Sequence, residues 1–479
     1  MKRLCSILCS ILAVAMLSSC VKDLPPDDTT ADTTTKTTTA AEETTAQEDS
    51  NTLLIAEQDA SPLFQVVYGV KNDESGTYAM QLINAVKDET GAQMKHVLDF
   101  YPAQETACEI LVGATMREEC ASVTDTLEKN EYAIRVVSGE GKTKIVIAYK
   151  GTYALMCAID RFVLEFVYQK NGRVEIPADL NIKGSFTEED AMIVSSITQL
   201  RDPCVLVENG VYYVYGTGWV CYKNTSGSLA GEWTPLGVVA EKPAEADKDF
   251  WAPEVHKYNG AYYMFTTYHS SVTGHRGCTI MKADSPEGPF REITSGQITP
   301  HDWDSIDGTF YVDDEGQPWM IFVHEWTSTD DGVGRMAAAK LSPDLTTFIS
   351  EPIELFRADD PSWAKGVITD GCWMYRTADG QLLMLWSNKD KGGYCVGVAR
   401  SISGKVDGEW TQDKTLLYSK DLHGTYEGGH GMIFYDTDGQ MYLSIHSPNS
   451  ASEARKEKPT FIPLREQDGM LVWDMWREE

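Results

Sequence analysis

The chain has 479 residues, of which 42% are hydrophobic, and its formal net charge at pH 7 is -31. This length exceeds that of a typical single domain, and the apolar content is ordinary for a globular core. The large negative charge argues against nucleic acid and anionic membrane surfaces as partners, because both would repel the protein. Neutral substrates are therefore expected.

The first twenty residues carry the three regions of an export signal. Residues 1–3 are basic, an apolar run follows, and the segment ends in Leu-Ser-Ser-Cys at residues 17–20. The apolar run is too short to span a bilayer. The ending resembles a bacterial lipobox, which implies cleavage before Cys20 and a lipid anchor at the extracellular face of a bacterial membrane. The alternative is an ordinary secreted protein whose signal peptide happens to contain Cys20.

Two further segments precede the main body of the chain. Residues 21–51 are rich in Thr and nearly free of large apolar side chains, so we expect a disordered linker. Residues 52–188 alternate between strand and helix patterns, with candidate strands at 109–112 and 144–148. One amphipathic helix is predicted before Gly91, and a second spans positions 155 to 166. This segment is predicted to be a small α/β accessory domain.

Residues 189–479 change to short strands, turns and many aromatic residues. Five turns, each followed by an apolar run, have glycines that lie 50, 56, 64 and 59 residues apart. Each turn is typical of a β-hairpin, and five repeats of this size predict an all-β, five-bladed β-propeller. The turns are Asn209-Gly210, Asn259-Gly260, Glu315-Gly316, Asp379-Gly380 and Asp438-Gly439.

A polar residue lies 6 to 10 positions ahead of each turn glycine. Since the first strand of every propeller blade lines the central channel, these five side chains are expected to converge at one channel mouth. Clustered carboxylates raise one another's pKa, so such a group favours acid–base chemistry or metal binding over a structural role. The residues are Asp202, Glu254, Asp307, Asp370 and His430.

At these positions the chain resembles glycoside hydrolase family 43, whose five-bladed enzymes act on arabinan and xylan. The resemblance covers about 280 residues and five motifs in order: Arg201-Asp202-Pro203, Trp251-Ala252-Pro253-Glu254, Ser305-Ile306-Asp307-Gly308, Thr369-Asp370-Gly371-Cys372 and Gly428-Gly429-His430-Gly431.

The resemblance implies a role for each motif. Asp202 would be the general base of an inverting hydrolysis, Asp370 the general acid, and Asp307 the residue that orients the acid and keeps it protonated. His430 would face a hydrated structural ion, often Ca²⁺, and no organic cofactor is expected. Asp370 departs from the Glu that is usual in the family, and the missing methylene shortens the reach of the acid by about 1.5 Å. The backbone either moves in to compensate, or the acid is weak or displaced.

The remaining site residues are predicted to contact substrate. Glu254 stands where the family usually has Asp, and the rings of Trp219, Trp251 and Trp326 are candidates for stacking on sugars. The chain is thus expected to be an extracellular, monomeric, lipid-anchored glycosidase that acts on arabinan, arabinoxylan or xylan.

Two alternatives stay open. One is a noncatalytic glycan-binding surface lipoprotein on the same propeller, which the Asp at position 370 favours. The other is a retaining fructan- or sucrose-cleaving enzyme; Arg201, which replaces the Asn of that Asn-Asp-Pro motif, argues against it.

Overall fold

The computed structural model describes residues 51–69, 74–100, 104–423, 426–450 and 456–476. Residues 51–479 form one compact unit. The predicted signal peptide and all but the last residue of the predicted linker lie outside the described residues. Within the described ranges, no helix is both long enough and apolar enough to cross a membrane.

The first part of the compact unit is built on a six-stranded mixed sheet. Its order is β3-β2-β4-β6-β5-β8, in which β2, β3, β4 and β6 run parallel and β5 is antiparallel to both of its neighbours. A separate pair of strands, β1 and β7, lies beside it. The bounds are β1 Thr52–Glu57, β2 Gln65–Tyr68, β3 His96–Leu98, β4 Cys108–Val112, β5 Glu131–Gly139, β6 Lys142–Tyr149, β7 Arg173–Pro177 and β8 Asn181–Ser185.

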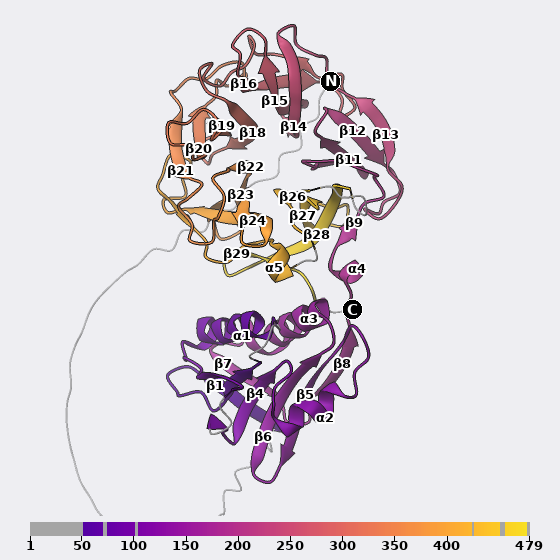
Figure 1. The fold of residues 1–479 in the computed structure, drawn as a ribbon, viewed down its shortest axis with the longest axis vertical. Coiled ribbons are helices and arrows are strands. Elements are labelled where there is room, and N and C mark those ends of the chain that lie inside the picture. Colours follow the sequence, from indigo (N-terminus) through magenta and orange to yellow (C-terminus); the bar gives the residue numbers. More distant parts are fainter. Residues whose placement is uncertain (1–50, 70–73, 101–103, 424–425, 451–455, 477–479) are drawn as a thin grey trace, which may run out of the picture. The chain divides into compact units, whose positions relative to one another are not determined.

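Helices cover both faces of this sheet (Figure 1). One face is covered by α1 (Ser75–Thr90) and by α3 (Thr152–Phe162), which continues as the π-helical segment Val163–Val167. The other face is covered by the short α2 (Glu118–Thr124). α1 ends at Gly91, which adopts a left-handed conformation and donates its N–H to the Lys87 carbonyl. The predicted helices, strands and helix stop are therefore confirmed.

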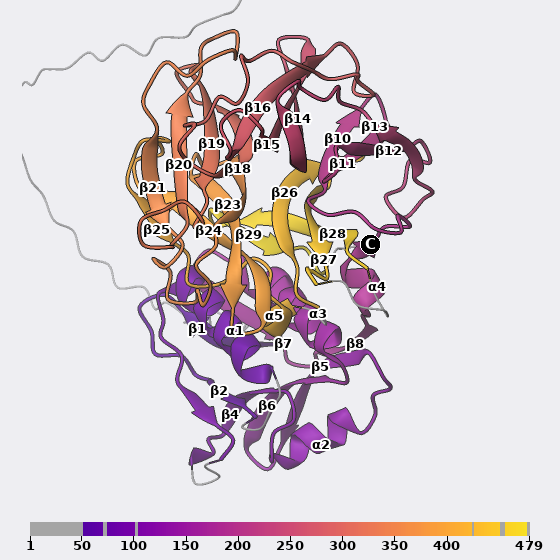
Figure 2. The same ribbon diagram turned by 45° about the horizontal axis from the view of Figure 1, so that its top comes forward.

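The rest of the unit consists of five antiparallel four-stranded blades arranged around a centre (Figures 1 and 2). This confirms the predicted five-bladed propeller. Blade one consists of β10–β13 (Cys204–Glu208, Val211–Gly216, Val220–Asn224, Thr234–Val238), and blade two of β14–β17 (Ala246–Tyr258, Ala261–Ser270, Arg276–Ala283, Arg291–Glu292). Blade three consists of β18–β21 (Ser305–Val312, Pro318–His324, Arg335–Lys340, Ile353–Arg357), and blade four of β22–β25 (Asp370–Arg376, Leu382–Asp390, Gly393–Ser401, Trp410–Gln412). Blade five consists of β26–β29 (Gly429–Tyr435, Met441–Ser447, Lys458–Gln467, Met470–Trp473).

The predicted turns join the first two strands of every blade. In blades one and two they are two-residue hairpins whose Asn and Gly both have positive φ, as type I′ turns require. In the other three blades the loop is longer, and Gly316, Gly380 and Gly439 have φ between 80° and 90°. The repeat therefore marks one equivalent place in each blade.

A short strand from the beginning of the propeller completes its last blade. β9 (Ile193–Val194) follows the short helix α4 (Glu188–Ala191) and pairs with β28, so blade five contains a segment that precedes blade one in sequence. The Ser195 N–H adds a hydrogen bond to the Pro459 carbonyl. This pairing closes the circle of blades.

An ion pair connects α3 with blade five. Both carboxylate oxygens of Asp160 accept hydrogen bonds from Arg465, at 2.6 and 3.0 Å. Asp160 also accepts the N–H groups of Met475 and Trp476. The buried side chains of α3 and of the outer strands of blade five belong to one hydrophobic cluster.

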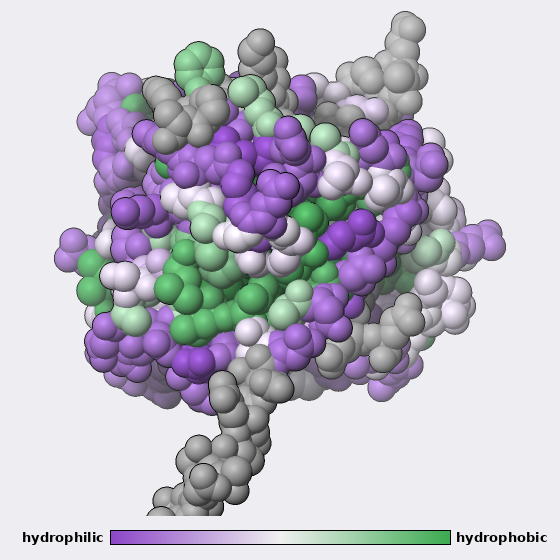
Figure 3. Space-filling model, turned by 90° about the horizontal axis from the view of Figure 1, so that it is seen from below, coloured by the Kyte–Doolittle hydropathy of each residue, from purple (hydrophilic) through white to green (hydrophobic). Residues whose placement is uncertain are grey.

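One face of the molecule carries a hydrophobic area. Figure 3 shows hydrophobic residues gathered between polar ones on a single face. In the α/β part, the exposed apolar side chains include Leu98, Phe100 and Met116. Asp99 lies between Leu98 and Phe100 in sequence, and its carboxylate accepts a hydrogen bond from the Met116 N–H.

Candidate active site

In each blade, a residue just before or within the first strand has a left-handed conformation; in blade two Asp249 (φ 58°) has one as well. The backbone is strained at such positions unless the residue is Gly, Asn or Asp, and strain of this kind gathers at functional sites. The five residues, one per blade, are Asp202 (φ 56°), Ala252 (φ 41°), Asp307 (φ 55°), Gly371 (φ 51°) and His430 (φ 57°).

The N–H of each of these five residues is bound by a neighbouring side chain, and these bonds form a ring around the channel. In four cases the acceptor lies seven residues after the turn glycine of the preceding blade. In blade three the residue at that position is Val323, whose side chain cannot accept a hydrogen bond. The Asp307 carboxylate accepts the Gly371 N–H instead. The bonds are Asp202 to His446 Nδ1 (3.2 Å), Ala252 to Thr217 (3.1 Å), Asp307 to Thr267 (3.0 Å), Gly371 to Asp307 Oδ2 (2.9 Å) and His430 to Ser387 (2.8 Å).

This ring refines the predicted equivalence of the five polar residues. Asp202, Asp307 and His430 occupy the left-handed positions themselves, as the motif spacing suggested. Glu254 lies two residues after the blade-two position, and Asp370 lies one residue before the blade-four position. The two side chains therefore leave the backbone at different places from the other three.

Three of the predicted residues are in direct contact. His430 Nδ1 lies 3.3 Å from Asp202 Oδ1 and 3.8 Å from Asp307 Oδ2. His446 Nδ1 also lies 3.3 Å from Asp202 Oδ1, and Thr217 donates its hydroxyl to Asp202 Oδ2. Asp202, Asp307 and His430 are all buried. The His430 imidazole and the Thr217 hydroxyl thus hold the Asp202 carboxylate, and His446 Nδ1 holds the Asp202 backbone N–H.

The carboxylates differ in their affinity for protons. Burial alone would raise the pKa of Asp202, but His430, His446 and Arg201 outweigh it and hold that pKa well below its usual range. Burial and the nearby charge of Asp202 raise the pKa of Asp307 to about 8. Burial and Asp307 raise the pKa of Asp370 to about 7. Near neutral pH the cluster therefore combines an ionised carboxylate with carboxyl groups that retain protons.

Asp370 is the most accessible of these carboxyl groups. It begins β22 and is partly exposed, whereas Asp202 and Asp307 are buried. Its Oδ2 accepts a hydrogen bond from the hydroxyl of Tyr394, at 3.1 Å. The adjacent Gly371 N–H is the one held by Asp307. Asp307 thus acts on Asp370 both by raising its pKa and through the backbone.

Glu254 lies deeper than the sequence suggested for a residue that contacts substrate. Its side chain is 1% exposed, and Oε2 lies 3.2 Å from His256 Nε2. Burial raises the pKa of Glu254 to about 8. At this exposure the carboxylate offers almost no surface to a ligand at the channel mouth.

The three predicted tryptophans have different surroundings. Trp219 is 2% exposed and packs edge-on against Phe250 and Tyr268, so the structure places it in the core with no ring face open to a sugar. Trp326 is partly exposed. Trp251 is also partly exposed, and the Arg276 guanidinium lies 5.5 Å from the centre of its ring.

Several residues of the site were not predicted. Thr217, Ser387 and His446 share a signal that the sequence contains, because each follows a turn glycine by seven residues. Tyr394 has no such signal, since it comes from the third strand of blade four. Arg201, which precedes Asp202, bonds to the Asn449 carbonyl and side chain (2.8 and 2.9 Å).

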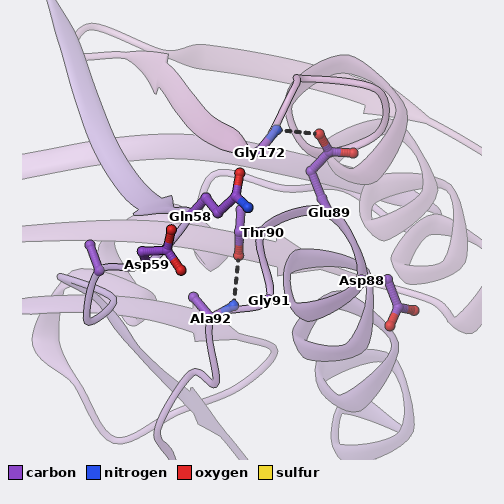
Figure 4. A pocket seen from close by; sticks show the side chains of 9 residues that line it. Gln58, Asp59, Asp88, Glu89, Thr90, Gly91, Ala92 and Gly172 are labelled. Carbon is purple, nitrogen blue, oxygen red and sulfur yellow. Dashed lines mark hydrogen bonds between the residues drawn. The ribbon is translucent and has the colours of Figure 1, made fainter.

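Two cavities lie away from this cluster. One, of about 410 Å³, lies in the α/β part beside the end of α1; within it Glu89 accepts the Gly172 N–H and Thr90 accepts the Ala92 N–H (Figure 4). The other, of about 900 Å³, is lined by residues that include Tyr132, Arg161 and Trp476. Neither cavity is lined by any of the five clustered residues.

Comparisons with known proteins converge on one group of enzymes. The crystal structure of an endo-arabinase from Bacteroides thetaiotaomicron VPI-5482 is similar with a TM-score of 0.52 and 37% identity, covering 58% of this chain and 98% of that one. The extracellular exo-α-(1→5)-L-arabinofuranosidase ArbA of Cellvibrio japonicus is 30% identical over 290 residues, which is 53% of this chain and 80% of that enzyme.

Another match is shorter. A probable arabinan endo-1,5-α-L-arabinosidase C of Aspergillus niger is 31% identical over 132 residues, so this chain spans only 41% of that relative. A family model for glycosyl hydrolases family 43 matches residues 196–465, which is more than half of the chain. The chain therefore belongs to glycosyl hydrolases family 43.

Proposed function

We propose that this family 43 glycosidase hydrolyses α-1,5-linked L-arabinofuranosyl bonds of arabinan by single-step inversion. Family membership makes it a glycoside hydrolase, and the names of its relatives point to arabinan more often than to xylan. The observation that carries the mechanism is the pairing of Asp202, whose pKa lies well below its usual range, with Asp370, whose pKa is about 7, at one channel.

Asp202 is the general base in this proposal. Its contacts with His430, His446 and Thr217 stabilise the ionised form and fix the direction of the carboxylate. It takes one proton from a water molecule as the water oxygen forms a bond to the anomeric carbon. The sugar is released with the opposite anomeric configuration.

Asp370 is the general acid. It gives its proton to the glycosidic oxygen while the bond from the anomeric carbon to that oxygen breaks, so the leaving sugar departs as an alcohol. Asp307 supports this role in two ways: it raises the pKa of Asp370, and it binds the N–H of Gly371. After the step, the proton taken up by Asp202 and the one lost by Asp370 are exchanged with solvent.

Blade four packs closely against blade five beside Asp370. A Cβ on Gly371 would lie 2.8 Å from the His430 Cα, so only glycine permits this approach. The Cys372 thiol donates to the Asp307 carbonyl at 3.0 Å, a contact that proline could not make. Both contacts fix the backbone beside Asp370.

The channel residues fit the hydrated Ca²⁺ that the family resemblance implied. His430 Nε2, Glu254 Oε1 and Thr309 Oγ1 are buried without a hydrogen-bond partner in the described structure. Among the described residues, no group of three or more His, Cys, Asp or Glu side chains is arranged to ligate an ion directly. His430 and Glu254 would therefore hold the ion largely through its water. When bound, the ion supplies positive charge beneath the acidic cluster.

The proposed function is tested by comparing the protein with its Asp202→Asn variant on linear α-1,5-arabinan and on a panel of aryl glycosides. The variant keeps the shape of the side chain but cannot accept the proton, so the release of sugar should fall at least about 10³-fold. Proton NMR of the first-formed anomer checks inversion. Substantial activity of the folded variant, or no activity of the wild type on any pentoside, would refute the proposal.

The same proposal includes attachment of a monomeric enzyme to the outer face of a bacterial membrane. It rests on the sequence of residues 1–20, which precede the described residues. In cells fed labelled fatty acid, the wild type should carry label and a Cys20→Ala variant should carry none. A wild type without label would leave secretion as the alternative, and sedimentation of the released protein tests the monomer.

A further inference from the structure

Tyr394 is bonded to the proposed general acid and has no place in the mechanism so far. It lies on β24, and its hydroxyl donates to Asp370 Oδ2 at 3.1 Å. The side chain is only 2% exposed. Burial and the neighbouring carboxylates Asp370, Asp202 and Asp307 raise the pKa of Tyr394 well above its usual range, so the phenol keeps its proton and remains a donor.

The ring of Tyr394 is held on several sides. It stacks on the imidazole of His446, with centroids 5.6 Å apart and planes 20° apart. A Cβ on Gly429 would lie 2.5 Å from the ring, so a glycine is needed there. The backbone N–H of Tyr394 donates to Glu427 Oε2 at 2.9 Å. The hydroxyl therefore has a fixed place relative to Asp370, and through His446 the ring also contacts a residue that holds Asp202.

The direction of this hydrogen bond determines which oxygen of the acid carries the proton. Because the carbonyl oxygen of a neutral carboxyl group accepts hydrogen bonds better than its hydroxyl oxygen, the bond from the phenol to Oδ2 favours the form of Asp370 whose proton is on Oδ1. Once Oδ1 has given that proton away, Asp370 becomes a carboxylate, and a hydrogen bond to an ionised acceptor is stronger than one to a neutral acceptor. The hydrogen bond from Tyr394 should therefore accelerate hydrolysis most for substrates whose leaving group must be protonated by Asp370.

We propose that Tyr394 is a positioning residue for the general acid, which directs the proton of Asp370 to Oδ1 and stabilises the carboxylate as that proton leaves. This inference rests on the proposed roles of Asp202 and Asp370. It assigns Tyr394 no contact with substrate.

The test uses Tyr394→Phe, which removes one oxygen and keeps the ring that packs on His446. Two α-L-arabinofuranosyl oligosaccharide glycosides that differ only in their leaving group are compared, one releasing 4-nitrophenol and the other an alcohol. The alcohol needs protonation and 4-nitrophenolate does not. We expect kcat/KM to fall about 10- to 100-fold for the alcohol and less than about threefold for the nitrophenol, with most of the loss in kcat.

A matched control is Tyr215→Phe, which also removes a buried tyrosine hydroxyl, the one bonded to the Pro286 carbonyl at 2.6 Å. It should affect both substrates alike. Asp370→Asn should show the same dependence on the leaving group as Tyr394→Phe, but more strongly.

The outcomes separate the inference from the proposed function. Equal losses on both substrates in Tyr394→Phe, while Asp370→Asn remains selective, would overturn the role of Tyr394 and leave the function intact. A wild type that cleaves neither glycoside would instead refute the proposed function.

Discussion

At the scale of single residues, the site depends on how neighbouring side chains divide protons among three aspartates. Asp202 faces two imidazoles and a hydroxyl, whereas Asp370 faces a phenol and is influenced by the Asp307 carboxyl group. The residue type is the same at both positions, but the charged form is stabilised at one and destabilised at the other. The assignment of base and acid follows from these contacts.

The pH dependence of hydrolysis follows from the same difference. Because the pKa of Asp370 is raised to about 7, the acid is protonated below that pH and loses its proton as the pH rises through it. The base stays ionised in mild acid, since the pKa of Asp202 lies well below its usual range. We therefore expect kcat/KM on an arabino-oligosaccharide to be high from mildly acidic to neutral pH and to fall above about pH 7.

The measurement is a kcat/KM profile from pH 4 to 9, in which the coupled carboxyl groups titrate as a set. A 4-nitrophenyl glycoside serves as the control, because its hydrolysis needs little help from the acid and should lose less activity at high pH. A profile that stays flat to pH 9 on the oligosaccharide would contradict the assignment of Asp370.

At the scale of elements, the α/β sheet contains a fully buried ion cluster that links β2, β4 and β6. Glu109 accepts hydrogen bonds from Gln65 (2.7 Å), Arg117 (3.0 Å) and Lys144 (2.7 Å). Burial would raise the pKa of Glu109, but these donors outweigh it and lower the pKa to about 2. The side chains of Glu109 and Lys144 are both 0% exposed. The cluster thus has no access to water that could replace a lost partner.

Replacing Glu109 by Gln should therefore destabilise the protein strongly. The substitution removes the nearer counter-charge of the buried Lys144 ammonium, at 2.7 Å, and leaves only Glu105 at 3.2 Å. Breaking a buried ion pair typically costs about 3–5 kcal/mol. Urea unfolding followed by circular dichroism measures the loss. In the wild type, the stability due to Glu109 should be complete above about pH 4.3, the unfolded pKa of Glu, and should disappear as the pH falls towards 2.

Glu241→Gln is a suitable control for this prediction. Glu241 forms an ion pair with Arg291 in which both side chains are more than half exposed, so its loss should barely change the urea midpoint. Equal effects of the two substitutions would show that the buried cluster has no special weight.

At the scale of the whole molecule, the propeller is closed by hydrogen bonds between distant parts of the chain. β9 pairs with β28, and the Ser195 N–H donates to the Pro459 carbonyl beside that pair. In a closed propeller every blade packs between two others, and the β9–β28 pair ties the segment before blade one to blade five. The closing pair should therefore affect the stability of all five blades.

Ser195→Pro tests this closure, because proline has no N–H to donate. We expect a lower thermal unfolding midpoint for the whole propeller, measured by calorimetry, rather than local fraying at β9. Ser196→Pro is the control next to it, since no backbone hydrogen bond is recorded for the Ser196 N–H in the described structure. If both variants unfold at the same temperature as the wild type, the closing pair contributes little.

The sequence by itself determined the architecture. Hairpin glycines depend on local backbone conformation, so their repeat predicted five blades, and the apolar periodicity predicted α1 and α3. It also placed Asp202, Asp307 and His430 together, because residues at equivalent places in successive blades must converge on the channel.

Only the tertiary structure decided which side chains are buried, which residues meet from different strands, and how strongly each acid holds its proton. It placed Trp219 in the core and Glu254 below the channel mouth, and it brought Tyr394 to Asp370 from another strand of the same blade. It also set the order of proton affinities, because a pKa depends on burial and on charges that are distant in sequence. Local pattern identifies the turns and the candidate acids, while contacts between blades determine which acid keeps its proton.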